Sequence, residues 1–189
     1  MAGYEDRLGH GTAVAALIHH LNPEAELFAV KIFEAKLATS LPAVVRAIDW
    51  CLVHEMNVIN LSLGTVNTDH RAMFELAVER VRRAGALIVS ALEIDGAPAL
   101  PGSLTGVIGV SETAIGSLLE YQMFERYGKP VYTAPSFARD IPGVPRDRNL
   151  KGVSFAVARI SALVARARTG NRDEHSWFQE VLPSFTSNT

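Results

Sequence analysis

Two residues that can do chemistry stand far apart in the chain, each at the start of an apolar run. His10 begins HGTAVAALI, and Ser154 stands at the head of GVSFAVARISALVA. An imidazole can act as general base for a hydroxyl nucleophile when the two groups lie within hydrogen-bond reach. Ser154 also has a simpler interpretation, because Ser before an apolar helix commonly caps its first turn. The pair predicts a base–nucleophile site only if the fold brings both helix starts together.

The segments that would position these residues are of two alternating kinds. Some are short runs rich in β-branched residues, and the others have apolar residues spaced as on one face of a helix. Continuous apolar runs are typical of strands in a sheet that is covered on both faces. The alternation of these runs with amphipathic helices predicts an α/β fold, a doubly wound three-layer α/β/α arrangement with a mostly parallel sheet. We expect a single domain, 1–189. The expected strands are Leu27–Phe33, Asn57–Leu63, Ala86–Leu92, Gly106–Glu112 and Val131–Pro135, and the expected helices are Gly11–His20, Leu41–Glu55, His70–Ala84 and Phe155–Arg168.

Net charge and hydropathy indicate which binding partners and which cellular location to expect. The 189 residues carry a formal net charge of −2, which gives no electrostatic reason to expect nucleic acid or an anionic membrane as partner. The N-terminus lacks the basic and apolar regions of a secretory signal, and no apolar run is long enough to span a bilayer. We therefore expect a cytoplasmic protein. No spacing of potential ligands indicates a metal site, and we expect no cofactor.

Several segments, in chain order, resemble those of the subtilisin-like serine proteases, the subtilase family. HGTAVAALI resembles the block that carries the family's general-base His, and GVSFAVARISALVA stands at the nucleophile block. FAVKIF, AIDWCLVHEMNVINLSLG, PGSLTGVIGV, YTAP and HSWFQEVLPSF resemble further segments of the family. The resemblance implies a subtilisin-like fold, a peptide or protein substrate, Ser154 as nucleophile and His10 as base. It also implies that Ser62, Leu63 and Gly64 bind the substrate backbone as an added strand.

Two parts of the family's catalytic site are missing from this sequence. The family's catalytic Asp lies on the first strand of its sheet, but only nine residues precede His10, so the sheet is expected to lack the family's first strands. Asp6 is a possible substitute carboxylate, although we favour a solvated turn there. An ungapped comparison places Ile94 where the family has the Asn that stabilises the oxyanion. In subtilisin, the source of these magnitudes, losing the Asp costs ~10⁴-fold in turnover and losing the Asn donor ~10²–10³-fold.

Two functions therefore stay open. The first is a subtilisin-like serine endopeptidase that is impaired or needs a partner to supply the missing Asp. The second is a catalytically inactive subtilase-like protein that binds peptide or acts as a scaffold subunit.

The expected lack of the first strand also affects the stability of the sheet, because buried backbone groups without hydrogen-bond partners destabilise a fold. Either Leu27–Phe33 pairs directly with Asn57–Leu63, or another chain, from a homo-oligomer or a different partner, completes the sheet. The chain as a fragment of a longer or split protein is a further alternative.

Overall fold

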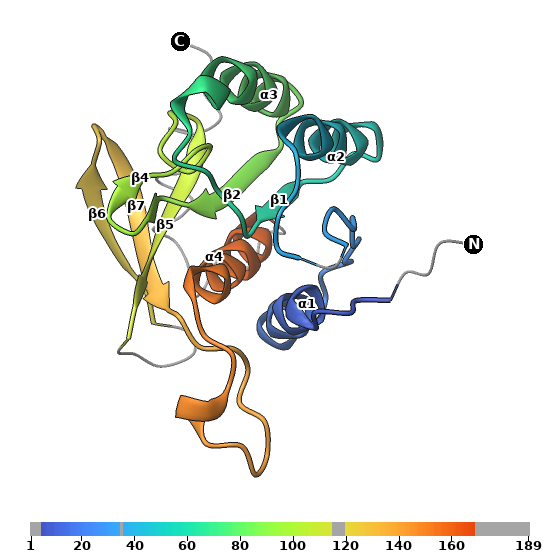
Figure 1. Cartoon of the computed structure of the whole chain (residues 1–189), viewed down its shortest axis with the longest axis vertical. Helices are drawn as coiled ribbons and strands as arrows, with labels where there is room; N and C mark the ends of the chain where they lie inside the picture. Colours follow the sequence, from blue (N-terminus) through green and yellow to red (C-terminus); the bar gives the residue numbers. More distant parts are fainter. Residues whose placement is uncertain (1–4, 35, 115–119, 169–189) are drawn as a thin grey trace.

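A five-stranded sheet lies between two layers of helices in the computed structural model, which describes residues 5–34, 36–114 and 120–168 (Figure 1). The strand order is β1-β2-β5-β7-β6, with β6 antiparallel and the other neighbours parallel. This confirms the predicted three-layer α/β/α fold with a mostly parallel sheet. The strands of the sheet are β1 (Val58–Leu61), β2 (Leu87–Ala91), β5 (Val107–Thr113), β6 (Gln122–Arg126) and β7 (Lys129–Pro135), and the helices are α1 (His10–Leu21), α2 (Leu41–Val53), α3 (Arg71–Arg83) and α4 (Val153–Arg168).

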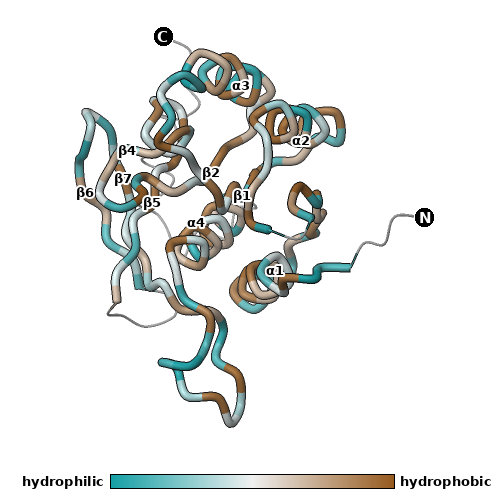
Figure 2. Tube along the Cα trace, in the orientation of Figure 1, coloured by the Kyte–Doolittle hydropathy of each residue, from teal (hydrophilic) through white to brown (hydrophobic). Residues whose placement is uncertain are grey.

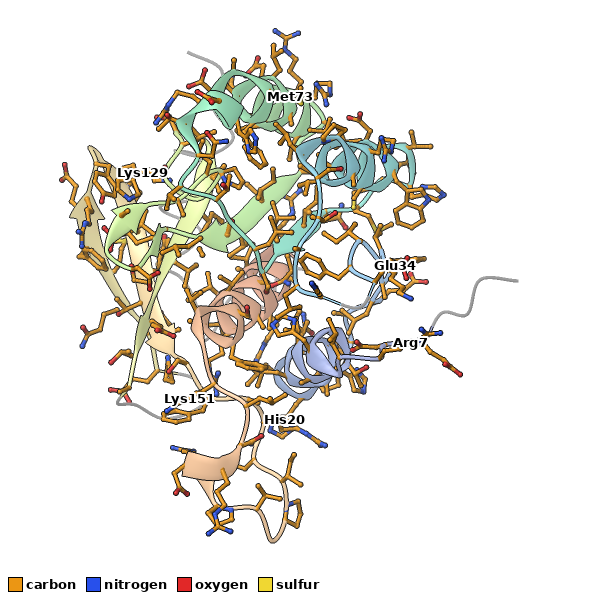
Figure 3. The ribbon with its side chains drawn as sticks, viewed as in Figure 1. Arg7, His20, Glu34, Met73, Lys129 and Lys151 are labelled. Carbon is orange, nitrogen blue, oxygen red and sulfur yellow. The ribbon has the colours of Figure 1, made fainter. Side chains whose placement is uncertain are left out.

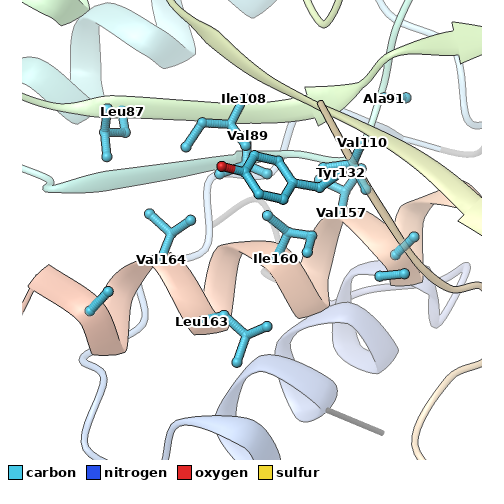
Figure 4. Close-up of a cluster of buried hydrophobic side chains, with 13 residues drawn as sticks. Leu87, Val89, Ala91, Ile108, Val110, Tyr132, Val157, Ile160, Leu163 and Val164 are labelled. Atoms are coloured by element: carbon cyan, nitrogen blue, oxygen red, sulfur yellow. The ribbon is translucent and has the colours of Figure 1, made fainter. Parts of the chain in front are cut away.

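Strand β2 shows why these sequences form a sheet that is buried on both faces. All five of its residues are buried, and successive side chains point to opposite faces. Leu87 and Val89 pack with α4, in the cluster that Figure 4 shows around Tyr132. Ile88 packs on the other face, with α2 and α3. The apolar colouring of β2 in Figure 2 reflects this burial on both sides.

Helix α4 is the central helix of one face. Eleven of its sixteen residues are buried, so both the sheet and α1 cover it. The contact with α1 uses small side chains, because the fully buried Ala158 and Ala162 lie against Leu17 of α1. The Ala-rich sequences therefore let the two helices approach closely. This packing fixes the N-termini of α1 and α4 relative to each other.

The predicted strand Leu27–Phe33 is wrong. The segment has no regular secondary structure, and Leu27 and Phe28 are 42% and 49% exposed. It does not pair with β1, whose ladder within the described residues runs only to β2. The predicted direct pairing of Leu27–Phe33 with β1 is therefore absent among the described residues, and an extended segment without a neighbour forms no ladder.

Smaller elements complete the fold. The sequence did not predict strand β6 or the short hairpin of β3 (Glu93–Ile94) and β4 (Ala97–Pro98). Arg139–Lys151 is a largely exposed loop that contains a 3₁₀ turn, Arg146–Arg148. HSWFQEVLPSF lies outside the described residues. Among the helices that are described, none has the length and apolar character needed to cross a membrane.

Candidate active site

His10 is the first residue of α1. Gly9 precedes it with a φ of +69°, a conformation that glycine adopts without strain. Gly9 has no side chain to cap the helix, so the N–H groups of the first turn need acceptors from elsewhere.

Asp6 supplies those acceptors. One carboxylate oxygen accepts the N–H groups of Leu8 and Gly9, at 3.2 and 3.0 Å. The other accepts the backbone N–H and the hydroxyl of Thr12, at 2.7 and 2.8 Å. The hydrogen bonds from Thr12 lower the pKa of Asp6 below its usual value. Asp6 thus caps α1, and in the described part of the chain no hydrogen bond joins it to His10.

Ser154 is the second residue of α4, at the opposite wall of the site. Its hydroxyl donates to the backbone carbonyl of Ser62, at 3.4 Å, and the Ser62 hydroxyl donates to the Ser154 carbonyl, at 3.1 Å. The side chain of Ser154 therefore contacts the end of β1 and does not cap α4. As a residue of the first turn, Ser154 also has a backbone N–H without a partner inside the helix.

The packing of α1 on α4 brings His10 close to this helix start. The His10 ring lies with its centroid 6.0 Å from that of Phe155, the neighbour of Ser154 in sequence. Both His10 and Ser154 are partly exposed. Within the described residues no hydrogen bond joins them, and such bonds are often loose in structures without substrate. The fold thus places the predicted base and nucleophile on adjoining helix starts.

The strip Ser62–Gly64 follows β1 directly and lies beside Ser154. Serine hydroxyls hold two of its carbonyls, because Ser154 donates to Ser62 and Ser90 donates to Leu63, at 3.0 Å. Gly64 makes no backbone hydrogen bond with any described residue. This leaves the polar groups of Gly64 available to an added strand.

Ile94 lies against this strip. A Cβ added at Gly64 would be 3.3 Å from the Cδ1 atom of Ile94, so the two residues are neighbours. The side chain of Ile94 offers no hydrogen-bond donor to a developing oxyanion. Glu93 points elsewhere, because its carboxylate accepts from the Tyr127 hydroxyl at 2.6 Å and pairs with Arg126. The neighbourhood of the predicted oxyanion position is therefore apolar.

A cavity of about 1140 Å³ opens on the His10 side of the site. Its walls include His10, Ser62, the outer edge of β1 and the segment Leu27–Phe33. No carboxylate of the described chain is hydrogen bonded to His10, and no cluster of described residues could hold a metal ion. His10 therefore borders the cavity without a hydrogen-bonded carboxylate among the described residues, although Asp6 lines the same cavity.

Two buried cations were missed by sequence reasoning. Arg159 of α4 donates to the carbonyls of Pro135 and Phe137 and so ties the end of β7 to the helix. Lys129 donates to three backbone carbonyls on the other side of the sheet. Each stands in an ordinary-looking stretch of sequence, because only the folded backbone brings their acceptors together.

A serine and a histidine thus lie at adjoining helix starts beside the end of a strand, an arrangement typical of serine hydrolases on an α/β sheet. The sequence matches the model of the Subtilase family over residues 2–181, so the chain belongs to that family.

Its relatives include known proteases. The chain is 30% identical over 204 residues to a thermostable alkaline protease of Halalkalibacterium halodurans, covering 98% of this chain and 51% of that protein. It is 29% identical over 199 residues to Subtilisin Savinase of Lederbergia lenta, covering 98% and 71%. A solved lanthipeptide protease shares its fold with a TM-score of 0.67 at 16% identity, over 93% of this chain and 66% of that one. The chain spans about half the length of several of the curated relatives that it matches.

Proposed function

We propose that this chain is the His/Ser part of a subtilisin-like serine endopeptidase that needs a carboxylate from outside its described residues. The observation that carries the proposal is the packing of α1 on α4, which sets His10 beside the start of the helix that bears Ser154. The relatives named above, which are proteases, support the same reaction class.

In the proposed reaction the peptide lies along Ser62–Gly64 as an added strand. The Ser154 oxygen attacks the scissile carbonyl carbon while His10 takes the hydroxyl proton. His10 then protonates the leaving amine, and water hydrolyses the acyl-enzyme. The Ser154 N–H donates a hydrogen bond to the oxyanion. The apolar side chain of Ile94 adds no second donor.

The missing carboxylate would enter through the cavity beside His10. Backbone on two sides of this cavity is unpaired within the described residues, because β1 has a free outer edge and Leu27–Phe33 forms no ladder. A partner chain, or a second copy of this one, that inserts a strand there would complete the sheet and could present an acidic side chain to the imidazole.

A fluorophosphonate probe tests the proposal, with the modified residue mapped by mass spectrometry. We expect slow labelling of Ser154, faster labelling when formate or acetate is added to occupy the open space at His10, and none in Ser154→Ala. The same salts should not change labelling of a control hydrolase with an intact triad. Failure to label Ser154 with or without added carboxylate contradicts the proposal.

A second candidate is a protein that binds peptides without cleaving them. The apolar Ile94 and the absence, among the described residues, of a carboxylate hydrogen bonded to His10 favour it, because both weaken catalysis but leave the strip Ser62–Gly64 in place. Calorimetry of the Ser154→Ala variant with a library of extended peptides tests it directly. Binding to wild type and variant alike, without hydrolysis by wild type, supports this candidate, and absence of binding to every peptide contradicts it.

A further inference from the structure

Helix α4 presents two serines, Ser154 and Ser161, to the end of β1. They are seven residues apart, about two helical turns, so both lie on the same side of the helix. Asn60 and Ser62 are alternate residues of an extended segment, and both side chains are on the face that α4 covers. Figure 3 shows Lys151, three residues before Ser154, on the loop that leads into this helix.

Three hydrogen bonds run in one direction across this contact. The Ser161 hydroxyl donates to the Oδ1 atom of Asn60, at 2.9 Å, and the Asn60 amide donates to the hydroxyl oxygen of Ser62, at 3.0 Å. The Ser62 hydroxyl in turn donates to the backbone carbonyl of Ser154, at 3.1 Å. The chain of hydrogen bonds therefore starts two turns inside α4 and ends on the backbone of the candidate nucleophile.

The direction of these hydrogen bonds follows from the protons that each group can give. A hydroxyl has a single proton, and a side-chain amide accepts through its oxygen and donates through its nitrogen. Because Ser161 donates to the Asn60 oxygen, the amide nitrogen is turned toward Ser62. The Ser62 oxygen then accepts from Asn60, so its own proton is directed at Ser154.

Ser161 is a buried residue with a polar side chain, only 3% exposed. A buried hydroxyl nearly always has a hydrogen-bond partner, and a serine inside a helix often finds it at a carbonyl of the preceding turn. Ser161 instead gives its one proton to a residue of β1. Asn60, Ser62 and Ser161 all line the cavity beside His10, so this chain of hydrogen bonds is part of the wall of the candidate site.

We propose that Ser161 is a positioning residue for Ser154 and acts through Asn60 and Ser62. This inference rests on the proposed peptidase function. Without the Ser161 proton the Asn60 amide is free to rotate, and Ser62 loses the donor that directs its hydroxyl at the Ser154 carbonyl. The same backbone carries the N–H proposed to bind the oxyanion, and small displacements of such groups slow a reaction.

Labelling of Ser154 by a fluorophosphonate tests this role in a double-mutant cycle of Ser161→Ala and Ser62→Ala. Ser161→Ala should slow labelling by about 2–10-fold, the size expected when one hydrogen bond of the site is lost. In the Ser62→Ala background the same substitution should have no further effect, because the connection to Ser154 is already broken. Equal slowing by Ser161→Ala with and without the Ser62 hydroxyl overturns the proposal.

Ile160→Val is the matched control for a loss of packing. It shortens a fully buried side chain of the same helix that packs in the cluster around Tyr132, outside the chain of hydrogen bonds. We expect this variant to label like wild type.

A second measurement does not depend on activity, so it separates this inference from the proposed function. By nuclear magnetic resonance, the side-chain amide protons of Asn60 should exchange faster with solvent in Ser161→Ala than in wild type, and the backbone amide resonance of Ser154 should shift. Ile160→Val should leave both signals unchanged. Absence of wild-type labelling would contradict the proposed function, and the two amide signals would still decide the role of Ser161. Unchanged signals in Ser161→Ala overturn that role.

Discussion

The two walls of the candidate active site differ in how completely they are built. On the Ser154 side, α4 buries eleven residues between the sheet and α1, and a reciprocal pair of hydrogen bonds joins Ser154 to Ser62. On the His10 side, α1 buries four residues and borders a cavity of about 1140 Å³. Ser154 is thus held by contacts within the chain, whereas His10 borders the cavity.

This difference bears on how the two side chains of the candidate site are held in place. The position of Ser154 depends on contacts inside the chain, which α4, β1 and β2 supply. The orientation of His10 depends on a third group that hydrogen bonds the imidazole, and no described residue does so. Within the described residues, Ser154 is therefore held by hydrogen bonds and His10 is not.

The largest expected effect is on the free energy of unfolding. It is measured by shortening one core residue on the Ser154 side and one on the His10 side. Ile160→Ala should lower the free energy of unfolding by about 3–5 kcal/mol, because Ile160 is fully buried between α4 and the sheet. Ile18→Ala should cost roughly half as much, because Ile18 already borders the cavity. Urea unfolding of both variants measures the difference. Equal losses would show that the His10 wall is packed as tightly as the other.

The next effect concerns the apolar neighbour of the strip. Ile94→Asn places an amide donor beside Gly64, so we expect labelling of Ser154 by a fluorophosphonate to quicken by about 10–100-fold, less than one donor is worth in a complete site. Ile94→Ala is the matched control, since it removes the side chain without adding a donor. Equal rates for the two variants would place the oxyanion position elsewhere.

The smallest effect concerns the cap of α1. Asp6→Ala should cost about 1 kcal/mol at neutral pH, because the helix loses its acceptors for the first turn. The folded state lowers the pKa of Asp6, so this contribution is complete above the unfolded value near 4 and is lost as pH falls through the folded pKa. Unfolding of wild type and variant should thus converge at acidic pH. Glu24→Ala, an exposed carboxylate outside the cap, should show no such convergence, and a gap that persists in acid would contradict the assignment.

Much of the fold could be predicted from the sequence because its signals are local. The apolar runs of β1, β2, β5 and β7 and the helical periods of α1 to α4 are each complete within their own segment, and all were found. Leu27–Phe33 carries the same local signal but lacks a neighbour, and strand formation depends on that neighbour. Strand β6 was missed because its mostly exposed residues carry little apolar signal.

Only the site residues that match the family's motifs could be predicted from the sequence. The motif named His10, Ser154 and Ser62–Gly64, and the structure places them on adjoining elements. It could not show that Asp6 caps α1, because that role depends on the loop geometry around Gly9. The buried amine of Lys129 was invisible for a similar reason, since its acceptors lie more than twenty residues away in the chain. The cytoplasmic location and the completing partner stay predictions.

The most direct test of the central claim is the effect of His10 on the reactivity of Ser154. We expect His10→Ala to slow labelling of Ser154 by at least ~10²-fold and to abolish its acceleration by formate, because the carboxylate acts through the imidazole. His19→Ala, at the far end of the same helix, should label like wild type. Unchanged labelling and unchanged acceleration in His10→Ala would show that the two side chains do not form one site.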